Sequence, residues 1–488
     1  MSKTGVSAPL ARLILELSFI LAATVVYVFS WNRLGIQLPL TTVALSATIV
    51  VLTGLSKRPL YRRTVIFMGL AITISLFSAF RLDNMINALN LWSVMFLMAF
   101  AGLNQVMPGK LWLKEYFLRS WTLPFKGAQQ FGGVLAGSKL TLNRHLSRSQ
   151  QGILRGLLLS IPVLLVFGLL FASADAVFKD LFSELTSLNT LWRTVISPRI
   201  ILTALFTMAL SGMLLYVVSG ADKPSEKRTV KKAYNTELTV MLGMVNVLFF
   251  TFVIIQAVYL FGGHDVVLNS DISYAEYGRK GFFELVWVAI GVFGLGFVFK
   301  GWNLLKAHKL NLVLLYVLIA QVGIIILSAL KRLSLYEQTY GFSELRVYAH
   351  MFVFFIIIAF VLLVLAIERK WLDTTFLHRL VLLGVGYVLL VNVVNVPALV
   401  ARQNLANPPQ NGQVDYNYIM SLSPDALPSQ IEVLERVKDQ ANVGYYRNYL
   451  CNNQGRRSID QNRHWSEYSF SQSSALSMYR DAGCQPLS

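Results

Sequence analysis

The side chains most able to do chemistry in this chain are acids, tyrosines and arginines that gather around a repeated motif. Gly-Phe-x-Glu-Leu occurs at 281–285 and again at 341–345, each time before a long apolar run. A carboxylate there could act as a base, and the arginines could bind phosphate or carboxylate groups. The candidate residues for such a polar cluster are Asp175, Tyr274, Tyr277, Arg279, Glu284, Tyr336, Glu344 and Arg346.

Three interpretations of the repeated motif stay open. Glycine is an acceptable N-cap, and a glutamate three residues later satisfies free amides and the helix dipole. By this interpretation Gly281 with Glu284, and Gly341 with Glu344, are simply two helix starts. The alternatives are a salt-bridge network between helices and a binding or catalytic site. Capping does not explain why Tyr and Arg accompany both copies.

The common signatures of enzymes and metal sites are missing. The sequence has no phosphate-binding loop, no His-Glu-x-x-His motif, no Cys/His cluster and no nucleophile elbow. We therefore expect no metal and no cofactor, and the motifs lean against an enzyme without excluding one. His350 stands alone in an apolar run and is expected to be a packing partner. Asn246, Gln321 and Asn392 are expected to hold neighbouring helices together.

The elements that must position these residues are membrane helices. The chain has 488 residues, 55% of them hydrophobic and 14% charged, whereas soluble proteins carry about 25% charged residues. Runs long enough to cross a bilayer as helices occur about eleven times. They lie near 11–30, 36–55, 64–80, 85–103, 153–172, 199–219, 238–262, 282–299, 310–330, 347–367 and 380–400. The expected fold is an all-α, polytopic transmembrane bundle.

The basic residues predict how this bundle is oriented. Of 43 Lys and Arg, 25 fall in segments that are cytoplasmic if the N-terminus is inside, and ten fall in the opposite loops. Cytoplasmic loops of membrane proteins are enriched in Lys and Arg. The bias predicts an N-in, C-out topology with an extracytoplasmic tail. It also accounts for the net charge of +18 without a nucleic-acid partner.

Four regions are expected along the chain. They are a four-helix membrane region at 1–103, a basic cytoplasmic segment at 104–152, a seven-helix membrane core at 153–400 and an extracytoplasmic region at 401–488. The basic and aromatic stretch at 110–155 is typical of an interfacial helix on anionic lipid, the alternative being a docking surface for a cytoplasmic partner. The tail is expected to be loop-rich apart from a short helix after Pro428.

The two cysteines also favour an extracytoplasmic tail. Cys451 and Cys484 are the only ones in the chain, and both lie in this region. In an oxidising compartment such a pair is expected to form a disulfide, with two free thiols as the alternative.

Five ordered motifs resemble a family of bacterial polytopic inner-membrane proteins of unknown function. The motifs are FASADAVF, SYAEYGRKGFFEL, LYEQTYGFSELRVYA, NVPALVARQNL and VDYNYIMSLSPDALPSQI, between about 171 and 433, and the first four helices lie outside the likeness. Asn395-Val396-Pro397 departs by one residue from the Asn-Pro usual in the family. The resemblance implies a bacterial inner membrane. It also implies that the Tyr/Arg/Glu motifs belong together with Ser423, Pro424 and Asp425.

Three functions fit these observations. The first is a transport, channel or envelope-accessory protein with an outward-facing polar cluster and a membrane or envelope protein as partner. The second is a membrane-embedded enzyme acting on a lipid- or glycan-type substrate at the outer leaflet. The third is a sensor or scaffold that binds an envelope ligand through its tail. The motifs name no substrate and no oligomeric state.

Overall fold

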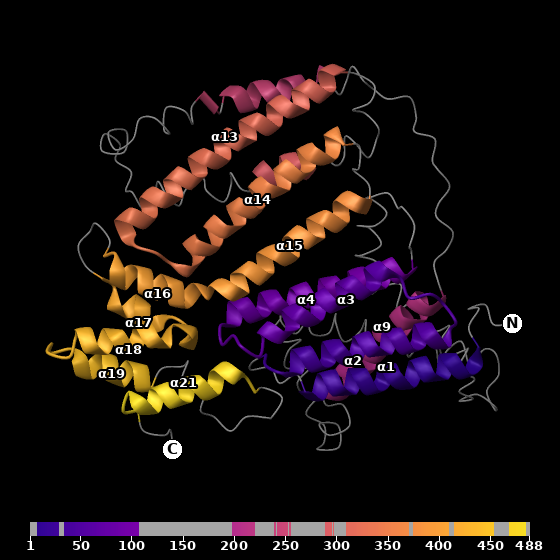
Figure 1. Ribbon diagram of the computed structural model, residues 1–488, viewed down its shortest axis with the longest axis horizontal. Helices are drawn as coiled ribbons and strands as arrows, with labels where there is room; N and C mark the ends of the chain where they lie inside the picture. The colour runs from indigo at the N-terminus through magenta and orange to yellow at the C-terminus, as the bar shows by residue number, and fades with distance from the viewer. Residues whose placement is uncertain are drawn as a thin grey trace, which may run out of the picture.

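The computed structural model describes residues 7–28, 34–106, 198–219, 309–369, 374–408, 414–452 and 468–484, with short helical pieces between 239 and 296. Throughout these ranges the regular structure is helical, and no strand occurs in them. The all-α expectation is therefore confirmed for the described part of the chain (Figure 1).

The first group of helices comes from the N-terminal part of the chain. Its members are α1 (Ala8–Val28), α2 (Gln37–Leu55), α3 (Arg62–Phe77), α4 (Asn84–Val106) and α9 (Pro198–Ser219). Helices α3 and α4 pack along each other, and α9 packs along α1. Their shared apolar core includes Leu52, Phe67, Ile74 and Phe100, each no more than 2% exposed. Tight packing of this kind is the main source of association between membrane helices.

The second group contains the longest helices, which are α13 (Lys309–Tyr340), α14 (Glu344–Glu368) and α15 (Thr374–Val394). Helix α15 packs on α14 and also on α3 and α4, so it joins the two groups. Asn90 of α4 and Asn392 of α15 exchange two amide hydrogen bonds of 2.9 and 2.7 Å. Asn246 donates to the carbonyl of Leu314 at 3.0 Å. These bonds confirm that polar side chains within the apolar runs hold helices together.

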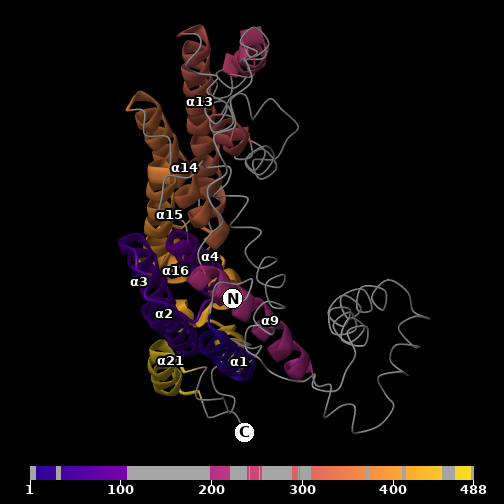
Figure 2. The same cartoon turned by 90° about the vertical axis from the view of Figure 1, so that its right-hand side faces the viewer.

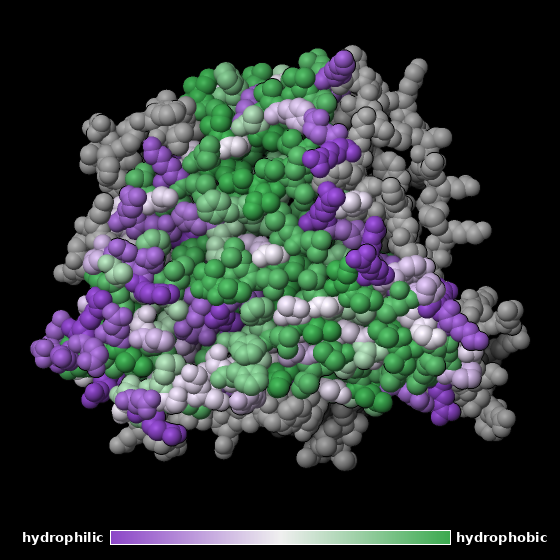
Figure 3. All heavy atoms as spheres, in the orientation of Figure 1, coloured by the Kyte–Doolittle hydropathy of each residue, from purple (hydrophilic) through white to green (hydrophobic). Residues whose placement is uncertain are grey.

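Six described helices are long and apolar enough to cross a membrane. They are Pro9–Val26, Gln37–Leu55, Asn84–Val106, Lys309–Tyr340, Glu344–Glu368 and Thr375–Val394. Apolar side chains also cover much of the face shown in Figure 3, with polar side chains toward its edges. The chain is therefore a multi-pass membrane protein. The span expected at 153–172 lies outside the described residues, and those at 238–262 and 282–299 are described only in part.

Two helix boundaries differ from the sequence-based expectation. Helix α13 continues to Tyr340 and is 32 residues long, although the apolar run was expected to end near 330. The span expected at 380–400 breaks at Asn395, which adopts a positive φ of 50°. Its side chain accepts a bond from the Ala398 amide, and Pro397 stands at the start of α16 (Val396–Ala406). Proline preorganises the first helical turn and ends the preceding helix, which explains the break.

The C-terminal region is more helical than the expected loop-rich tail. It contains α16, α17 (Tyr416–Ser421), a 3₁₀ turn (Pro424–Ala426), α18 (Leu427–Arg436), α19 (Val443–Asn452) and α21 (Phe470–Asp481). Helix α18 is the one expected near Pro428. A second apolar core binds this region together and includes Ile419, Leu427, Val433 and Leu450, all fully buried. Burial of these apolar residues stabilises the short helices, which isolated would be marginal.

The C-terminal region covers one end of the helix bundle, which we call the capped end. The turn between α3 and α4 (residues 78–83) and the turn between α13 and α14 (residues 341–343) both lie there, beside α16 to α21 (Figure 1). The turn at 56–61 lies at the opposite end. Figure 2, viewed from the right-hand side of Figure 1, shows α13, α14 and α15 extending away from the first group of helices.

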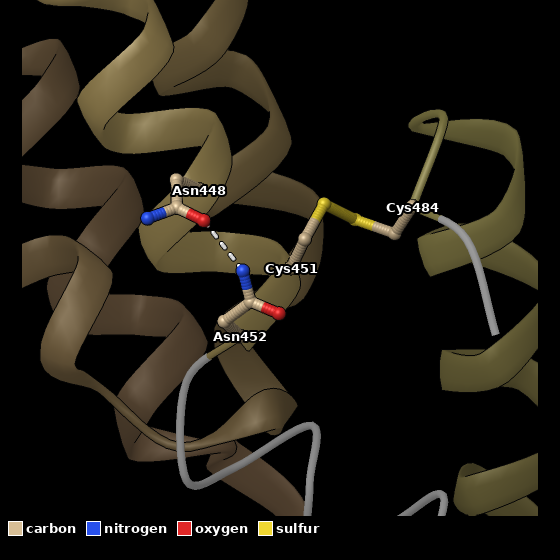
Figure 4. The surroundings of a disulfide bond; sticks show 4 residues. All are labelled: Asn448, Cys451, Asn452 and Cys484. Carbon is tan, nitrogen blue, oxygen red and sulfur yellow. Dashed lines mark hydrogen bonds between the residues drawn. A yellow bond between two sulfur atoms is a disulfide. The ribbon is translucent and has the colours of Figure 1, made fainter. Parts of the chain in front are cut away.

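A disulfide closes the C-terminal region. Cys451 on α19 is joined to Cys484, just past α21, with the two Cα atoms 5.3 Å apart (Figure 4). The expected pairing of the two cysteines is present in the structure.

Candidate functional site

The described residues hold three of the eight candidates, namely Tyr336, Glu344 and Arg346. Asp175, Tyr274, Tyr277, Arg279 and Glu284 lie outside the described residues. The convergence of the two Gly-Phe-x-Glu-Leu motifs therefore stays a prediction, and the second copy can be examined by itself.

The second motif forms a tight turn rather than a glycine-capped helix start. Gly341 has a φ of +78°, and its amide donates to the carbonyl of Glu337 at 2.8 Å. A glycine in this left-handed conformation typically ends a helix, and here it ends α13. Ser343 occupies the N-cap position of α14, and Glu344 is the first residue of that helix. Of the three interpretations, the one in which Gly341 caps α14 with Glu344 at its third position is therefore wrong for this copy.

Two of the predicted site residues stabilise this turn. Arg346 donates a hydrogen bond to the carbonyl of Gly341. Its guanidinium carbon also lies 3.9 Å from the centre of the Tyr336 ring, on the preceding helix. A guanidinium over an aromatic face is a favourable cation–π contact. Arg346 and Tyr336 thus join α13 to α14, which gives the tyrosine and arginine of the second motif a structural role.

Glu344 lies where the membrane helices meet the C-terminal region. Its amide donates to the hydroxyl of Tyr418 on α17 at 3.0 Å. Its side chain interacts electrostatically with Asp83, before α4, and with Asp425, before α18. Its Oε1 atom is buried and has no hydrogen-bond partner among the described residues. No hydrogen bond within the described residues accounts for the burial of this oxygen.

Asp425 connects the C-terminal region to the turn at 78–83. Its two carboxylate oxygens accept bonds from the amides of Leu82 and Asp83, at 3.1 to 3.2 Å. Burial raises the pKa of Asp425, while those amides and the Arg81 guanidinium oppose the rise. Asp83 in turn accepts a bond of 2.8 Å from the Ile86 amide and caps α4. Both aspartates are thus explained by the backbone amides that they pair.

Arg81 is the basic member of this neighbourhood. Its guanidinium donates to the carbonyls of Asn392 and Val393, in the last turn of α15. Burial lowers the pKa of Arg81, and the nearby Asp425 opposes that effect. Cations are favourable at the negative end of a helix. Next to the same helix end, Asn395 donates to the carbonyl of Asp425 at 3.3 Å.

Tyr348 completes the group, one turn after Glu344. It is 7% exposed, and its hydroxyl has no hydrogen-bond partner in the part of the chain that the structure describes. The ring hydroxyl interacts electrostatically with Asp83, Glu344 and Asp425. We call these three carboxylates, with Tyr348 and Arg81, the acid cluster. Within the described ranges, no three His, Cys, Asp or Glu residues are arranged to hold a metal ion.

The sequence pointed to part of the acid cluster. Glu344 was a candidate, and the family motifs placed it together with Asp425, as the structure does. Arg81, Asp83 and Tyr348 were missed. Tyr348 lies within the motif LYEQTYGFSELRVYA but was not chosen as a candidate, and Arg81 and Asp83 lie outside all five motifs. The one available signal was Arg-x-Asp at 81–83 in a short loop between two apolar runs.

A second polar pair lies deeper between α13 and α14. Nδ1 of His350 is 3.2 Å from Oε1 of Glu337, whose side chain is 9% exposed. His350 is therefore not the isolated packing residue that the sequence suggested. A carboxylate buried in a span is expected to have a partner. His350 is the nearest candidate, although Glu337 Oε1 makes no hydrogen bond within the described residues.

Comparison with known families assigns this chain to a family without a known activity. Residues 64–433 match the model described as Domain of unknown function (DUF4153), and the chain belongs to that family. The match begins earlier than the resemblance at 171–433 suggested. It includes α3 and α4 with the 78–83 turn, so the expectation that all four N-terminal helices lie outside is wrong for these two. No curated protein and no solved structure matches the chain.

Proposed function

We propose that this protein has a transport or envelope-accessory role in a bacterial inner membrane. In this role the acid cluster lies on the extracytoplasmic side and responds to the binding of a cation, a proton or a ligand. The observation that carries the proposal is the buried, unpartnered Oε1 of Glu344 beside two further carboxylates. A buried polar atom without a partner costs about 1–3 kcal/mol, and more if the group is charged. A bound cation, a proton or a hydrogen-bond donor from a ligand would remove this cost.

The distribution of charge and cysteine supports an extracytoplasmic capped end. Lys57, Arg58, Arg62 and Arg63 are exposed at the opposite end of the bundle. Positive charge of this kind is typical of the cytoplasmic side. The Cys451–Cys484 disulfide lies at the capped end. Disulfides persist in oxidising compartments, so the two observations favour the same orientation.

The burial of Glu344 Oε1 favours a role in coupling the membrane helices to the C-terminal region over a role in hydrolysis. An enzyme acting on a lipid or glycan needs its acid or base within hydrogen-bond reach of the substrate. This oxygen is shielded in the described structure. It does lie between the membrane helices and the C-terminal region, where a change of its charge would act on both.

The site is tested by Glu344→Gln, which removes the charge and keeps the shape. A deletion strain is first screened for an envelope phenotype and then complemented. The matched control is Glu432→Gln, because Glu432 is exposed and its partner within the described residues is Arg436 on its own helix, at 2.8 Å. We expect the control to complement and Glu344→Gln to fail at an equal protein level. Full complementation by both variants would remove the site from consideration.

The orientation is tested by cysteine labelling in whole cells. Lys438 is exposed just after α18, and Arg58 is exposed at the opposite end. We expect Lys438→Cys to react with a membrane-impermeant maleimide in intact cells, and Arg58→Cys to react only after lysis. The reverse pattern would invert the topology.

A further inference from the structure

Three aromatic side chains form an exposed group at the capped end. Phe80 follows α3, while Tyr468 and Phe470 precede and begin α21. Their exposed fractions are 48%, 43% and 52%. The rings of Phe80 and Phe470 stack with centroids 5.1 Å apart, and Tyr468 meets Phe470 edge to face at 5.5 Å. We call these three residues the aromatic group.

Backbone hydrogen bonds fix the aromatic group to the membrane helices. The Phe470 amide and the Ser469 hydroxyl both donate to the carbonyl of Ala79 at 2.8 Å. The Ser471 hydroxyl donates to the carbonyl of Phe80 at 2.5 Å. On the other side, the Ile36 amide donates to the carbonyl of Tyr468 at 3.0 Å. The start of α21 is therefore attached to the ends of α2 and α3, and the exposure of its rings is not the result of a loose terminus.

The aromatic group continues the apolar outer surface of these helices. Leu76 in the last turn of α3 is 47% exposed, and Leu40 in the first turn of α2 is 46% exposed. Helix α2 is one of the candidate spans. Exposed apolar side chains on a span face lipid acyl chains. We therefore expect Phe80, four positions beyond Leu76, to stand at the boundary where acyl chains give way to headgroups.

The rest of α21 shows that it does not lie in the bilayer itself. Ala475 and Tyr479 are buried against the second apolar core, and the outward positions are occupied by Ser473, Ser474 and Ser477. A helix embedded in the interface would carry large apolar residues along its outer face. Here only the first turn carries them, next to the bundle.

We propose that the aromatic group inserts into the phospholipid headgroup region of the leaflet at the capped end, and so ties the C-terminal region to the membrane surface. Tyrosine suits this layer because its ring is apolar and its hydroxyl can stay hydrated. The Phe rings extend the apolar contact toward the acyl chains. The occupant that we propose is the lipid of the protein's own membrane, which the exposed Leu40 and Leu76 on the same helices favour.

The proposal is tested by spin labelling of the full-length protein in liposomes of phosphatidylethanolamine and phosphatidylglycerol. A nitroxide is attached to Phe470→Cys, to Tyr468→Cys and to the control Tyr445→Cys. Tyr445 is a 58% exposed aromatic residue on α19. The native cysteines stay paired and do not react. Collisions of each label with oxygen, which concentrates in lipid, are compared with collisions with a water-soluble nickel chelate.

We expect the labels at 468 and 470 to collide more with oxygen than with the nickel chelate, and the label at 445 to show the opposite preference. A nickel preference at 468 and 470 equal to that at 445 would place the aromatic group in water and overturn the proposal. Protection of both labels from both reagents would show that protein covers the group, and would also overturn it. An intact disulfide in each variant confirms folding, and the two positions give independent readings.

Discussion

The two turns at the capped end are both held by the C-terminal region, but by different means. The turn at 78–83 is held by a carboxylate, since Asp425 accepts bonds from the amides of Leu82 and Asp83. The turn at 341–343 is held by an amide, since Asn404 accepts from the Phe342 amide at 2.7 Å and donates to its carbonyl at 2.8 Å. In both cases one side chain satisfies the backbone of a chain reversal.

The two turns differ in how the acidic side chains beside them are paired. Asp83 and Asp425 each pair with backbone amides, so their conformations follow from the turn that they stabilise. Glu344 stands beside the other turn, and its buried Oε1 pairs with nothing described. Acids of the same kind in one neighbourhood thus have two roles. Capping explains the aspartates, and it leaves the glutamate as the residue to test for function.

The largest expected effect comes from removing the disulfide, which weakens the support of both turns together. The bond joins residues separated by 33 positions. Closing a loop of that length is worth about 3–4 kcal/mol by chain entropy. The double variant Cys451→Ser with Cys484→Ser should lower the thermal unfolding midpoint and expose α21 to protease. An unchanged midpoint and protease pattern would show that the apolar core alone holds the region.

Asp425→Ala should affect the two turns unequally. It leaves two backbone amides without their partner, at an expected cost of about 2–4 kcal/mol. Hydrogen exchange should accelerate at Leu82 and Asp83 and stay unchanged at Phe342. The control is Asp415→Ala, which removes only the cap of α17, a bond of 2.9 Å to the Tyr418 amide. An equal loss of stability in both variants would contradict the special role of Asp425.

Asn404→Ala is the reciprocal test and should have a somewhat smaller effect. It removes two neutral hydrogen bonds from Phe342, so we expect the free energy of unfolding to fall by about 1–3 kcal/mol. Exchange should now accelerate at Phe342, with Leu82 protected as before. Asn407→Ala is the matched control, because the exposed Asn407 side chain bonds, among the described residues, to the Gln403 side chain at 2.9 Å. Faster exchange at Leu82 would mean that the two turns open together.

The smallest expected effect is a dependence of stability on pH. Burial raises the pKa of Asp425 above its ordinary value. The folded state therefore holds this proton more tightly than the unfolded state does. The resulting contribution to stability is present below the ordinary aspartate pKa and is lost as the pH rises through the raised value. The stability of the native protein relative to Asp425→Asn should accordingly fall with rising pH in that window. If the stability of the native protein relative to Asp425→Asn rose with pH instead, the predicted direction would be wrong.

The elements were easier to predict from the sequence than the way they meet. Apolar runs predicted helices near α1, α2, α4, α14 and α15, because the thickness of a bilayer fixes their length. The same reasoning ended α13 too early. Its last turn is polar at Glu337 yet stays helical until Gly341 takes a positive φ. Hydropathy predicts where a helix leaves the lipid. It does not predict where the helix itself ends.

The acid cluster could be predicted only in part for a different reason. Leu82 and Asp425 are 343 positions apart, and the sequence around either residue does not predict the contact. The family motifs linked Glu344 with Asp425 because both belong to recurring stretches. Arg81 and Asp83 carry no such mark. The role of Arg81 follows from the packing of α4 on α15, which depends on tertiary structure, whereas Asp83 caps α4 through a local bond to the Ile86 amide.

The attachment of α21 to the first helices also sets an order of events during synthesis. The bond from Ser469 to Ala79 spans 390 positions. Helices α2 and α3 are made early, but the carbonyl groups that follow α3 receive these partners only once residues 469 to 471 have left the ribosome. A chain that stalls before residue 468 lacks this closure, even with every described membrane helix already synthesised. The attachment of α21 is therefore completed only after α2, α3 and the other described membrane helices have been made.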